Sequence, residues 1–480
     1  MNYFMVFYII GWILEFEAAF LLLPALVGCF YGEFRQSLCF LLSALISFLA
    51  GFLLKRKKPD SRELYMREGF VTVSLGWFSM SAFGAIPFVM TGDIPHYIDA
   101  LFEAISGFTT TGASILSEVE HLSHAGLFWR SFTHWIGGMG VFVFIMAILP
   151  LMGGSTMNLM RAESTGPSVD KLVPRVKDSA KILYELYIGL TILGAIVFMI
   201  LGMTPFDAFA TIFGTVGTGG FGIRNTSIAS YSPQLQWAIT VFMLLSGINY
   251  SVYFLIMRRR AKEAFRIEEV RWYLIFVVLC TGLISFDLRD VCMSFGERIR
   301  DAAFQVASII TTTGFSTVDF DAWPAFSKSI LLILMFVGSC SGSTAGGIKI
   351  SRIVILTKSI GKELSLMIHP RQVQKIRIDG RPVAHETVRA TNVFLVSYMV
   401  VYVSSFLLLS INEYDFTTNF TAVAAMLGNI GPGFSMVGPT QNFGFFSPFS
   451  KMILMFDMLA GRLELFPLLI LLRPAAWKKY

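Results

Sequence analysis

The sequence predicts an all-α integral membrane protein with four helix, pore-loop, helix repeats in pseudo-fourfold symmetry, preceded by two extra N-terminal transmembrane helices. Hydrophobic residues make up 55% of the 480 residues and charged residues only 15%, whereas soluble domains carry about a quarter charged residues. Apolar runs long enough to cross a bilayer recur along the whole chain. Four Gly/Thr-rich turns, each after a short amphipathic segment, divide these runs into repeats of roughly 100 residues.

Ten apolar runs supply the expected spans, two before the repeats and two in each repeat. They lie near 3–30, 38–54, 69–91, 126–153, 180–203, 234–257, 270–286, 328–345, 390–411 and 449–472. The first run has no basic leader region and no small-residue cleavage site, so we expect a retained helix rather than a signal peptide. The expected divisions are residues 1–67 for the leading helices and 68–160, 161–268, 269–385 and 386–480 for the four repeats.

The basic residues predict how the chain is oriented in the membrane. They gather between the repeats and after the last one, at 55–67, 161–181, 258–271, 349–389 and 473–479. Because basic loops stay in the cytoplasm, we expect the N-terminus and the inter-repeat loops there, with the four turns entering from outside. This topology accounts for the net charge of +6, which we do not interpret as nucleic-acid binding. The five cysteines form no CxxC pair and indicate neither a disulfide framework nor a zinc site.

A short helix is predicted before each of the four turns. The four helices are expected to open at Asp99, Asp207, Asp301 and Thr417, residue types that cap the free amide groups of a helix start. In the first three repeats the opening Asp stands thirteen residues before the glycine taken as the centre of the turn. A helix that runs inward from the outer face directs its partially negative C-terminal end toward the membrane centre, where it favours a cation.

The turns combine glycine, which permits unusual backbone conformations, with threonine, which adds oxygen atoms. If Gly112, Gly220, Gly314 and Gly431 are equivalent, each turn gives carbonyl oxygens to one ring, the arrangement that replaces the hydration shell of K⁺ in potassium channels. No residue of the four turns is ionisable, which argues against a transition-metal site or a proton relay. The predicted K⁺-binding residues are Thr110, Thr111, Gly112, Thr218, Gly219, Gly220, Thr312, Thr313, Gly314, Asn429, Ile430 and Gly431. The alternative is a set of glycine-rich turns that only close helix hairpins.

Four features occur together in this chain: the repeats after a leading helix pair, GSCSGSTAGGIK at 338–349, NIGPG at 429–433 and GRLELF at 461–466. As a set they resemble the TrkH/TrkG branch of the Trk/Ktr/HKT potassium-uptake superfamily, over essentially the whole chain. The resemblance implies a gated, K⁺-selective uptake pathway in the bacterial inner membrane, a homodimer, and control by a cytosolic, nucleotide-binding TrkA-like regulator. It implies K⁺ as the bound ion and no organic cofactor in this chain. The second turn departs from the Thr-Thr-Gly pattern and Pro432 follows Gly431, so the filter glycines of repeats 2 and 4 stay open.

The second helix of repeat 3 is interrupted by a stretch rich in glycine and serine. Residues 338–347 contain four glycines and three serines, and each interior glycine costs a helix about 1 kcal/mol relative to alanine. We therefore expect a broken helix, which the resemblance assigns as an intramembrane gating loop. The predicted gating residues are Gly338, Gly342, Gly346, Gly347 and Lys349. The alternative is a close helix crossing lined by small residues.

Arg462 lies inside the last apolar run, where a charge is costly unless it is paired or hydrated. Facing the pathway below the filter, its positive charge would raise the barrier for K⁺ and make conduction depend on gating. The resemblance favours this role. The alternative is a snorkelling arginine or a salt bridge to Asp457 or Glu464.

The sequence carries no nucleophile arrangement, Walker motif or dinucleotide-binding fingerprint, so we do not expect an enzyme. A passive, gated K⁺ pathway is our first hypothesis. The alternatives are a symporter that couples K⁺ to Na⁺ or H⁺ and the membrane subunit of an ATP-driven K⁺ pump. Coupled carriers usually contain inverted repeats and intramembrane carboxylates, whereas these four repeats are expected to enter from one face and deep acidic residues are few.

Overall fold

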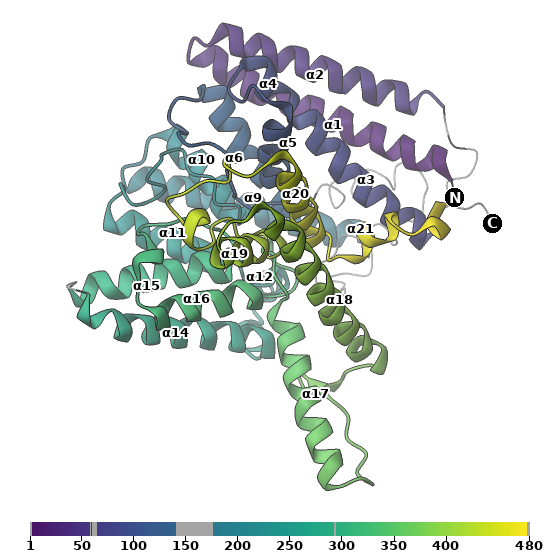
Figure 1. Ribbon diagram of the computed structural model, residues 1–480, viewed down its shortest axis with the longest axis vertical. Helices are drawn as coiled ribbons and strands as arrows, with labels where there is room; N and C mark the ends of the chain where they lie inside the picture. Colours follow the sequence, from purple (N-terminus) through teal and green to yellow (C-terminus); the bar gives the residue numbers. More distant parts are fainter. Residues whose placement is uncertain (1, 58, 60–64, 141–175, 292–293, 478–480) are drawn as a thin grey trace.

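The computed structural model describes residues 2–57, 59, 65–140, 176–291 and 294–477, and these fold almost entirely into helices (Figure 1). Six of the described helices are long and apolar enough to cross a membrane, as the composition predicts. The predicted run 126–153 beyond Gly140, the predicted boundary after residue 160 and most of the basic stretch 161–181 lie outside the described residues. The predicted all-helical membrane class is confirmed by the rest of the chain.

Two leading helices, α1 (Tyr3–Phe30) and α2 (Phe34–Lys55), form an antiparallel hairpin at one edge of the molecule (Figure 1). Their backbones come close where Gly11 faces Gly51. A Cβ atom built on Gly11 would lie 2.7 Å from the carbonyl oxygen of Gly51. Small residues at such a crossing let two membrane helices pack through their main chains, which is the packing mode available without a hydrophobic driving force.

Each repeat contains an outer helix, a short pore helix and a second helix. The outer helices are α3 (Met66–Gly84) with the short α4 (Ile86–Thr91), α9 (Val176–Ile200), α14 (Glu268–Asp287) and α18 (His385–Leu409). The pore helices are α5 (Tyr97–Phe108), α10 (Pro205–Val216), α15 (Phe295–Ile310) and α19 (Phe416–Leu427). The second helices are α6 (His124–Met139), α11 (Pro233–Ser246) with α12 (Tyr250–Met257), α16 (Ala325–Val337) with α17 (Ile350–Ile368), and α20 (Pro448–Arg462) with α21 (Phe466–Leu471).

The remaining elements are short and connect these helices. They are α13 (Ala261–Ala264) and the 3-10 helices η2 (Leu288–Asp290), η3 (Phe320–Ala322), η4 (Ser410–Asn412), η5 (Ser435–Val437) and η6 (Pro474–Trp477). Strands β1 (Arg377–Ile378) and β2 (Arg381–Pro382) pair antiparallel after α17, with Ile378 opposite Arg381. Asp379 and Gly380 form the two-residue turn, and both have positive φ (52° and 76°), as the tightest hairpin turns require.

The starts of the pore helices differ from the prediction. Three pore helices have side-chain caps, from Thr204, Ser294 and Asp415, and the cap of α5 is His96 without a side-chain hydrogen bond. The predicted opening residues Asp99, Asp207, Asp301 and Thr417 therefore lie within the helices, and their assignment as caps was wrong. The aspartates pair with basic side chains instead: Asp99 with Lys451, Asp207 with Arg224 and Asp301 with Arg300.

Hydrogen bonds near these helix starts lower the pKa of two carboxyl groups, those of Glu297 and Asp415. The hydroxyl and amide of Ser294 lower the pKa of Glu297, which completes a capping box at the start of α15. Partial burial raises the pKa of Asp415, but the hydroxyl and amide of Thr418 outweigh it, and the net pKa is below the ordinary value. Both carboxylates are therefore held in the charged form that a helix N-terminus favours.

The second helices are broken where the apolar pattern predicts continuous spans. The predicted run 234–257 is two helices bent by 92° around residues 247–249. The predicted run 449–472 is interrupted after Arg462, where Glu464 and Leu465 both adopt positive φ (54° and 67°). The apolar pattern cannot predict such breaks, because the helix ends at each break are buried among the other repeats. The run of apolar residues therefore continues across the break.

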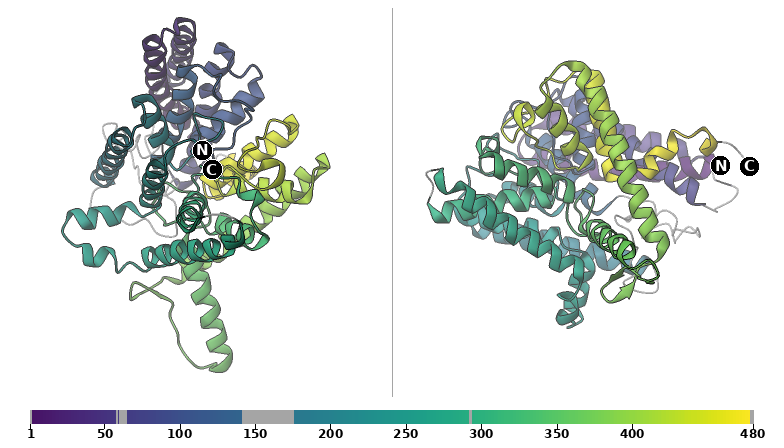
Figure 2. Two further views of the ribbon diagram at one scale, coloured as in Figure 1. Left: turned by 90° about the vertical axis from the view of Figure 1, so that its left-hand side faces the viewer. Right: turned by 60° about the horizontal axis from the view of Figure 1, so that its bottom comes forward.

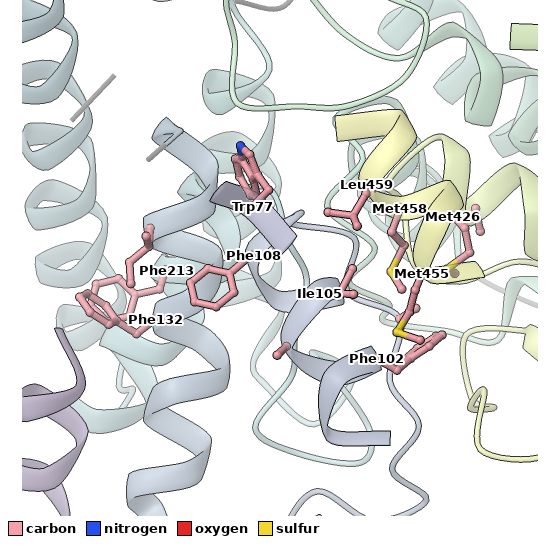
Figure 3. Close-up of a cluster of buried hydrophobic side chains, with 14 of the residues drawn as sticks. Trp77, Phe102, Ile105, Phe108, Phe132, Phe213, Met426, Met455, Met458 and Leu459 are labelled. Atoms are coloured by element: carbon pink, nitrogen blue, oxygen red, sulfur yellow. The ribbon is translucent and has the colours of Figure 1, made fainter. Parts of the chain in front are cut away.

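The packed core lies around the pore helices (Figure 3). Aromatic side chains fill the region between α3, α5, α6 and α10, whereas methionines dominate between α19, α20 and α5. The aromatic group comprises Trp77, Phe108, Phe132 and Phe213, and the methionine group comprises Met426, Met455 and Met458. These large buried side chains hold the C-terminal ends of the pore helices in place, which positions the four turns.

One element departs from the compact body. Helix α17 extends away from the other helices (Figure 2), and the β1–β2 hairpin that follows it lies beside it, since Lys358 of α17 donates to the carbonyl of Arg377 on β1 (2.7 Å). The far half of α17 exposes a row of apolar side chains at helical spacing, namely Ile360, Leu364, Met367 and Ile368. Such a row on a projecting helix is more typical of an interaction surface than of an isolated monomer surface.

Candidate functional site

All four pore helices end in the same backbone turn. One residue beyond the helix cap, the chain adopts the left-handed conformation, with φ of 55° at Thr110, 54° at Thr218, 55° at Thr312 and 52° at Asn429. Positive φ is uncommon for any residue with a side chain and is an outlier for a β-branched threonine. Strain of this kind persists only where surrounding structure enforces it, and it concentrates at functional sites.

The hydrogen bonds of the four turns are also equivalent. The amide two residues beyond the helix cap donates back to a carbonyl in the last turn of the helix: Thr111 to Ser106 (2.9 Å), Gly219 to Gly214 (2.8 Å), Thr313 to Ser308 (2.8 Å) and Ile430 to Ala425 (2.8 Å). Together with the left-handed residue before it, this bond defines the Schellman motif. The sequences of the turns differ, yet their backbones follow one path.

A glycine with positive φ follows each motif, at Gly112 (78°), Gly220 (78°), Gly314 (81°) and Gly431 (95°). In repeat 2, Gly217 is the helix cap and Gly219 precedes this position. In repeat 4, Gly433 lies two residues beyond it and does not have positive φ. The structure thus places Gly220 and Gly431 in register with the glycines of repeats 1 and 3.

The four turns close into a cycle of main-chain contacts. A Cβ atom added to each glycine would collide with a carbonyl oxygen of the next repeat: Gly112 with Gly219 (2.0 Å), Gly220 with Thr313 (1.8 Å), Gly314 with Ile430 (2.1 Å) and Gly431 with Thr111 (2.7 Å). Repeat 1 therefore rests on repeat 2, repeat 2 on repeat 3, repeat 3 on repeat 4, and repeat 4 on repeat 1. We call these four turns the ring.

The side chains that brace the ring are not the same in every repeat. In repeats 1 and 3, two threonine hydroxyls bond across the turn at 2.8 Å, Thr109 with Thr111 and Thr311 with Thr313. In repeat 4, the amide nitrogen of Asn429 donates to the Thr111 hydroxyl of repeat 1 (2.9 Å) and to the carbonyl of Met458 (2.8 Å). Asn429 therefore ties its own turn to its neighbour.

In repeat 2 a histidine occupies the space of the missing threonine side chains. The ring of His134, on α6, packs directly on Gly219, where a Cβ would lie 2.1 Å from Nδ1. It also stacks on Phe221 with ring centroids 4.2 Å apart. This role of His134 could not be predicted from the sequence, because the histidine stands 85 residues before the glycine it supports and shares no local motif with it.

A buried ion pair holds the segment that follows Gly112. Arg130 on α6 and Glu103 on α5 lie 2.8 Å apart with side chains 2% and 0% exposed. Glu103 also accepts hydrogen bonds from Ser114 and from the amide of Ile115 (2.9 and 3.1 Å), while Arg130 donates to the carbonyl of Gly222 (3.1 Å). The pair thus links the segments that follow two neighbouring turns, those after Gly112 and Gly220. The sequence did not predict this ion pair.

Beneath the ring, the predicted loop at 338–347 is present as an irregular segment between α16 and α17. Its two ends pair through their main chains: the amide of Lys349 donates to the carbonyl of Val337 (3.1 Å) and that of Ile350 to Ser339 (3.0 Å). Gly338, Gly342 and Gly347 have positive φ between 69° and 77°. The loop is therefore a folded structure rather than a helix crossing of small residues.

The loop contacts repeats 2, 3 and 4 directly and reaches repeat 1 only through Arg462. The Thr344 hydroxyl donates to the carbonyl of Val216 in repeat 2 (3.0 Å), and the amide of Gly346 donates to the Thr312 hydroxyl in repeat 3 (2.7 Å). A Cβ on Gly346 would lie 2.5 Å from the carbonyl oxygen of Gly428 in repeat 4. Arg462 completes the set through repeat 1.

Arg462 is 8% exposed and lies below the ring, at the end of α20. It donates to the Thr110 hydroxyl (3.2 Å) and to the carbonyls of Gly137 and Gly138 (3.0 Å for the latter), all in repeat 1. It also donates to the loop carbonyl of Thr344 (2.8 Å). Asp457, one of the predicted alternative partners, instead accepts from Ser405 (2.6 Å), so a snorkelling or Asp457-paired arginine does not describe this side chain.

Two more basic groups lie in the same inner layer. Lys349 is 1% exposed and its ammonium group donates to the carbonyl of Ala345 inside the loop. Arg352, in the first turn of α17, pairs with Glu464 and packs over the ring of Phe394 at 3.9 Å. Buried positive charge so close to a passage opposes cations unless it moves or is neutralised.

The chemistry of the outer part is that of oxygen atoms alone. The ring offers carbonyl and hydroxyl oxygens, and no residue of the four turns can titrate. Within the described residues, no group of three or more His, Cys, Asp or Glu side chains is arranged to hold a metal. Carbonyl and hydroxyl oxygens suit a hard, weakly hydrated monovalent cation rather than a transition metal.

The fold and the site together define a multi-span membrane protein in which four repeats surround one central passage. Comparison with known proteins agrees. The model of the TrkH cation transport protein family matches residues 36–479, and the chain belongs to this family.

Individual relatives are similar over nearly their full lengths. The Trk system potassium uptake protein TrkH of Vibrio parahaemolyticus is 37% identical over 481 residues, with 98% of each chain covered. TrkG of Escherichia coli K12 is 32% identical over 474 residues, which cover 98% of this chain and 97% of TrkG. The crystal structure of the potassium transporter TrkH from V. parahaemolyticus matches with a TM-score of 0.89 at 34% identity, covering 100% of both chains.

Proposed function

We propose that the protein is a potassium-uptake protein whose ring forms a K⁺-selective filter and whose inner layer is a gate. The observation that carries the proposal is the closed cycle of glycine-to-carbonyl contacts, since it brings main-chain oxygens of four repeats together around one centre. The relatives named above are potassium uptake proteins, which supports K⁺ as the ion. The filter residues are those predicted from the sequence, with Gly112, Gly220, Gly314 and Gly431 as its four equivalent glycines.

The gate in this proposal consists of the loop at 338–347 together with Arg462. Both lie under the ring, and their contacts with all four repeats support a closed passage. The guanidinium group of Arg462 adds an electrostatic barrier to the steric one. Conduction then requires the loop and this charge to leave the axis, so a regulator needs to move only the inner layer.

The regulator in this proposal is a cytosolic TrkA-like nucleotide-binding protein. The name of the relatives, a Trk system, supports additional subunits. The docking surface is the projecting part of α17 with the β1–β2 hairpin, which carries exposed apolar side chains and basic residues expected in the cytoplasm. The same exposed face suits a second copy of the chain, which agrees with the predicted homodimer.

One observation favours the coupled alternative. Two carboxyl groups are buried inside the membrane layer, and neither carboxylate oxygen of Glu17 nor Oδ2 of Asp457 finds a hydrogen-bond partner among the described residues. Intramembrane carboxylates are the usual proton or sodium sites of coupled carriers. Both groups lie behind the pore helices rather than in the ring, so we rank coupling second.

Ion flux into liposomes that contain the purified protein tests the proposal. We expect K⁺ and Rb⁺ to enter faster than Na⁺ and Li⁺ and to follow only their own electrochemical gradients. Accumulation of K⁺ against its gradient, driven by a pH or Na⁺ gradient, would replace the passive pathway with a symporter. Empty liposomes and liposomes with the Gly314→Ser variant are the controls.

A further inference from the structure

The first turn of α14 contacts the loop through a single carboxylate. Oε1 of Glu269 accepts a hydrogen bond from the amide of Ser341, in the middle of the loop, at 2.7 Å. The same oxygen accepts from the amide of Ser351, in the first turn of α17, at 3.2 Å. One atom of repeat 3's outer helix therefore joins the loop to the helix that follows it.

Helix α17 lacks a cap of its own. Its N-cap residue is Lys349, which has positive φ (83°) and makes no side-chain capping bond. The first amide groups of a helix need an acceptor, and a carboxylate is the strongest one available. Glu269 supplies it from another helix, so the cap of α17 depends on how α17 is placed against α14.

The neighbouring residue extends this connection toward the projecting end of α17. Glu268 pairs with Lys358 on α17 (2.6 Å), and its amide donates to the carboxylate of Asp379 in the hairpin turn (2.6 Å). Lys358 also donates to the carbonyl of Arg377 on β1 (2.7 Å). A continuous set of polar contacts thus runs from the β1–β2 hairpin through the start of α14 to the loop.

We propose that Glu269 is a positioning residue that holds the loop in its closed conformation and couples it to the position of α17. Movement of α17 relative to α14 lengthens the bond to Ser351 first, and the bond to Ser341 loses its anchor. The inference deepens the proposed function, because it rests on the loop being the gate. The occupant that moves α17 is the cytosolic regulator of that proposal.

The test is unstimulated K⁺ flux through the full-length protein in liposomes without a regulator. We expect Glu269→Ala to raise this flux about tenfold, which corresponds to about 1.4 kcal/mol, while the K⁺/Na⁺ flux ratio stays at the wild-type value. Glu269→Gln retains an oxygen acceptor, so the flux of this variant should stay within about twofold of wild type. The matched control is Glu386→Ala, which removes an exposed carboxylate from the first turn of another outer helix, α18.

A second pair of variants leaves Glu269 in place. Ser351→Pro removes the amide donor at a helix position where proline is tolerated, whereas Ser351→Ala keeps the amide and removes only the hydroxyl, which bonds to the Ser341 hydroxyl of the loop. We expect Ser351→Pro to raise the flux more than Ser351→Ala. Hydrogen exchange of the peptide that covers 338–352 should accelerate in Glu269→Ala and return toward the wild-type rate in Glu269→Gln.

A variant with residues 341–344 deleted separates the inference from the proposed function. If the deletion raises K⁺ flux but Glu269→Ala and Ser351→Pro do not, the gate is correct and the role of Glu269 is refuted. If the deletion leaves K⁺ flux unchanged, the loop is not the gate and the proposed function fails at that point. A fall in the K⁺/Na⁺ ratio in Glu269→Ala would also overturn the inference, because it would mean that the ring itself had been disturbed.

Discussion

In the orientation predicted from the basic loops, the outer half of the passage is built from equivalent parts and the inner half from unlike ones. In the outer half, four pore helices with different sequences end in one backbone motif, and their glycines meet in a closed cycle. In the inner half, three of the second helices are interrupted within the described residues, each in a different way. The interruptions follow Ser246, Val337 and Arg462.

This difference separates two tasks that one structure would perform poorly. A filter needs equal contributions from all sides, because an ion is surrounded by its ligands. A gate needs only one movable part that can be reached from outside the passage, and we propose that in this chain the part is the loop of repeat 3 with Arg462 of repeat 4. Variants in one half should therefore leave the property of the other half intact.

The largest expected effect comes from the outer half. Arg130→Met leaves Glu103 as a buried charge without its partner, and breaking such a pair costs about 3–5 kcal/mol. We expect a large loss of thermal stability in detergent, or failure to fold, measured by the unfolding temperature of the purified protein. The double variant Arg130→Met, Glu103→Leu should recover part of the loss, whereas unchanged stability of the single variant would contradict a structural role for the pair.

Gly314→Ser is aimed at selectivity. The new side chain would meet the carbonyl of Ile430 at 2.1 Å, so the ring must open on one side and the K⁺/Na⁺ flux ratio should fall about tenfold. Gly189→Ser is the matched control, because a Cβ at that outer-helix glycine has no neighbour within 4 Å. A wild-type flux ratio in Gly314→Ser would reject the register in which this glycine belongs to the filter.

Arg462→Gln addresses the charge of the inner half, although Arg462 also donates to the Thr110 hydroxyl of the ring. It removes the positive charge under the ring but keeps a donor for the carbonyls that surround it. We expect unstimulated K⁺ flux to increase by up to about tenfold, which corresponds to a barrier lowered by about 1.4 kcal/mol. The K⁺/Na⁺ flux ratio should not change. If selectivity fell as well, the division into two independent halves would have to be abandoned.

The smallest effect concerns the outer ends of the pore helices. The pKa of Glu297 is below its ordinary value, so the capping box contributes stability above that ordinary value, about 4.3, and the contribution is lost as pH falls through the lowered pKa. Glu297→Gln keeps an uncharged capping box. The difference in unfolding temperature between wild type and this variant should therefore be present at pH 6 and vanish near pH 3.

Composition and apolar runs were enough to predict the membrane fold, and the resemblance carried by the repeats and by the motifs at 338–349, 429–433 and 461–466 indicated the family; both are confirmed. The Thr-Thr-Thr-Gly turns of repeats 1 and 3 also indicate the glycine position, because in both repeats the glycine follows the same three threonines at the same distance from the short helix. Repeat 2 keeps the thirteen-residue spacing and Thr218 but lacks the Thr-Thr-Thr-Gly pattern, and His134 from another helix packs on its Gly219. Helix caps were predicted wrongly because the pore helices begin two to six residues before these aspartates, whose carboxylates pair with Lys451, Arg224 and Arg300 instead.

The breaks in the second helices could be predicted only where glycine and serine are concentrated. The loop of repeat 3 has that composition, whereas the break after Arg462 falls at Glu464 and Leu465, ordinary helix formers held at positive φ by their surroundings. Tertiary packing outweighs helix propensity there. For the same reason Glu269 could not be recognised from the sequence, because its partners lie 72 and 82 residues away.

The cyclic arrangement of the ring has a mechanical consequence. Each turn packs against the next, and the fourth packs against the first. No turn can therefore move outward without displacing the turn beside it. A close-packed main-chain contact of this kind resists small deformations. The aperture of the ring is therefore expected to keep one size during the transport cycle. Because all four repeats lie in one chain, a mutation changes only one quarter of the ring, and the neighbouring turns restrict how large that change can be.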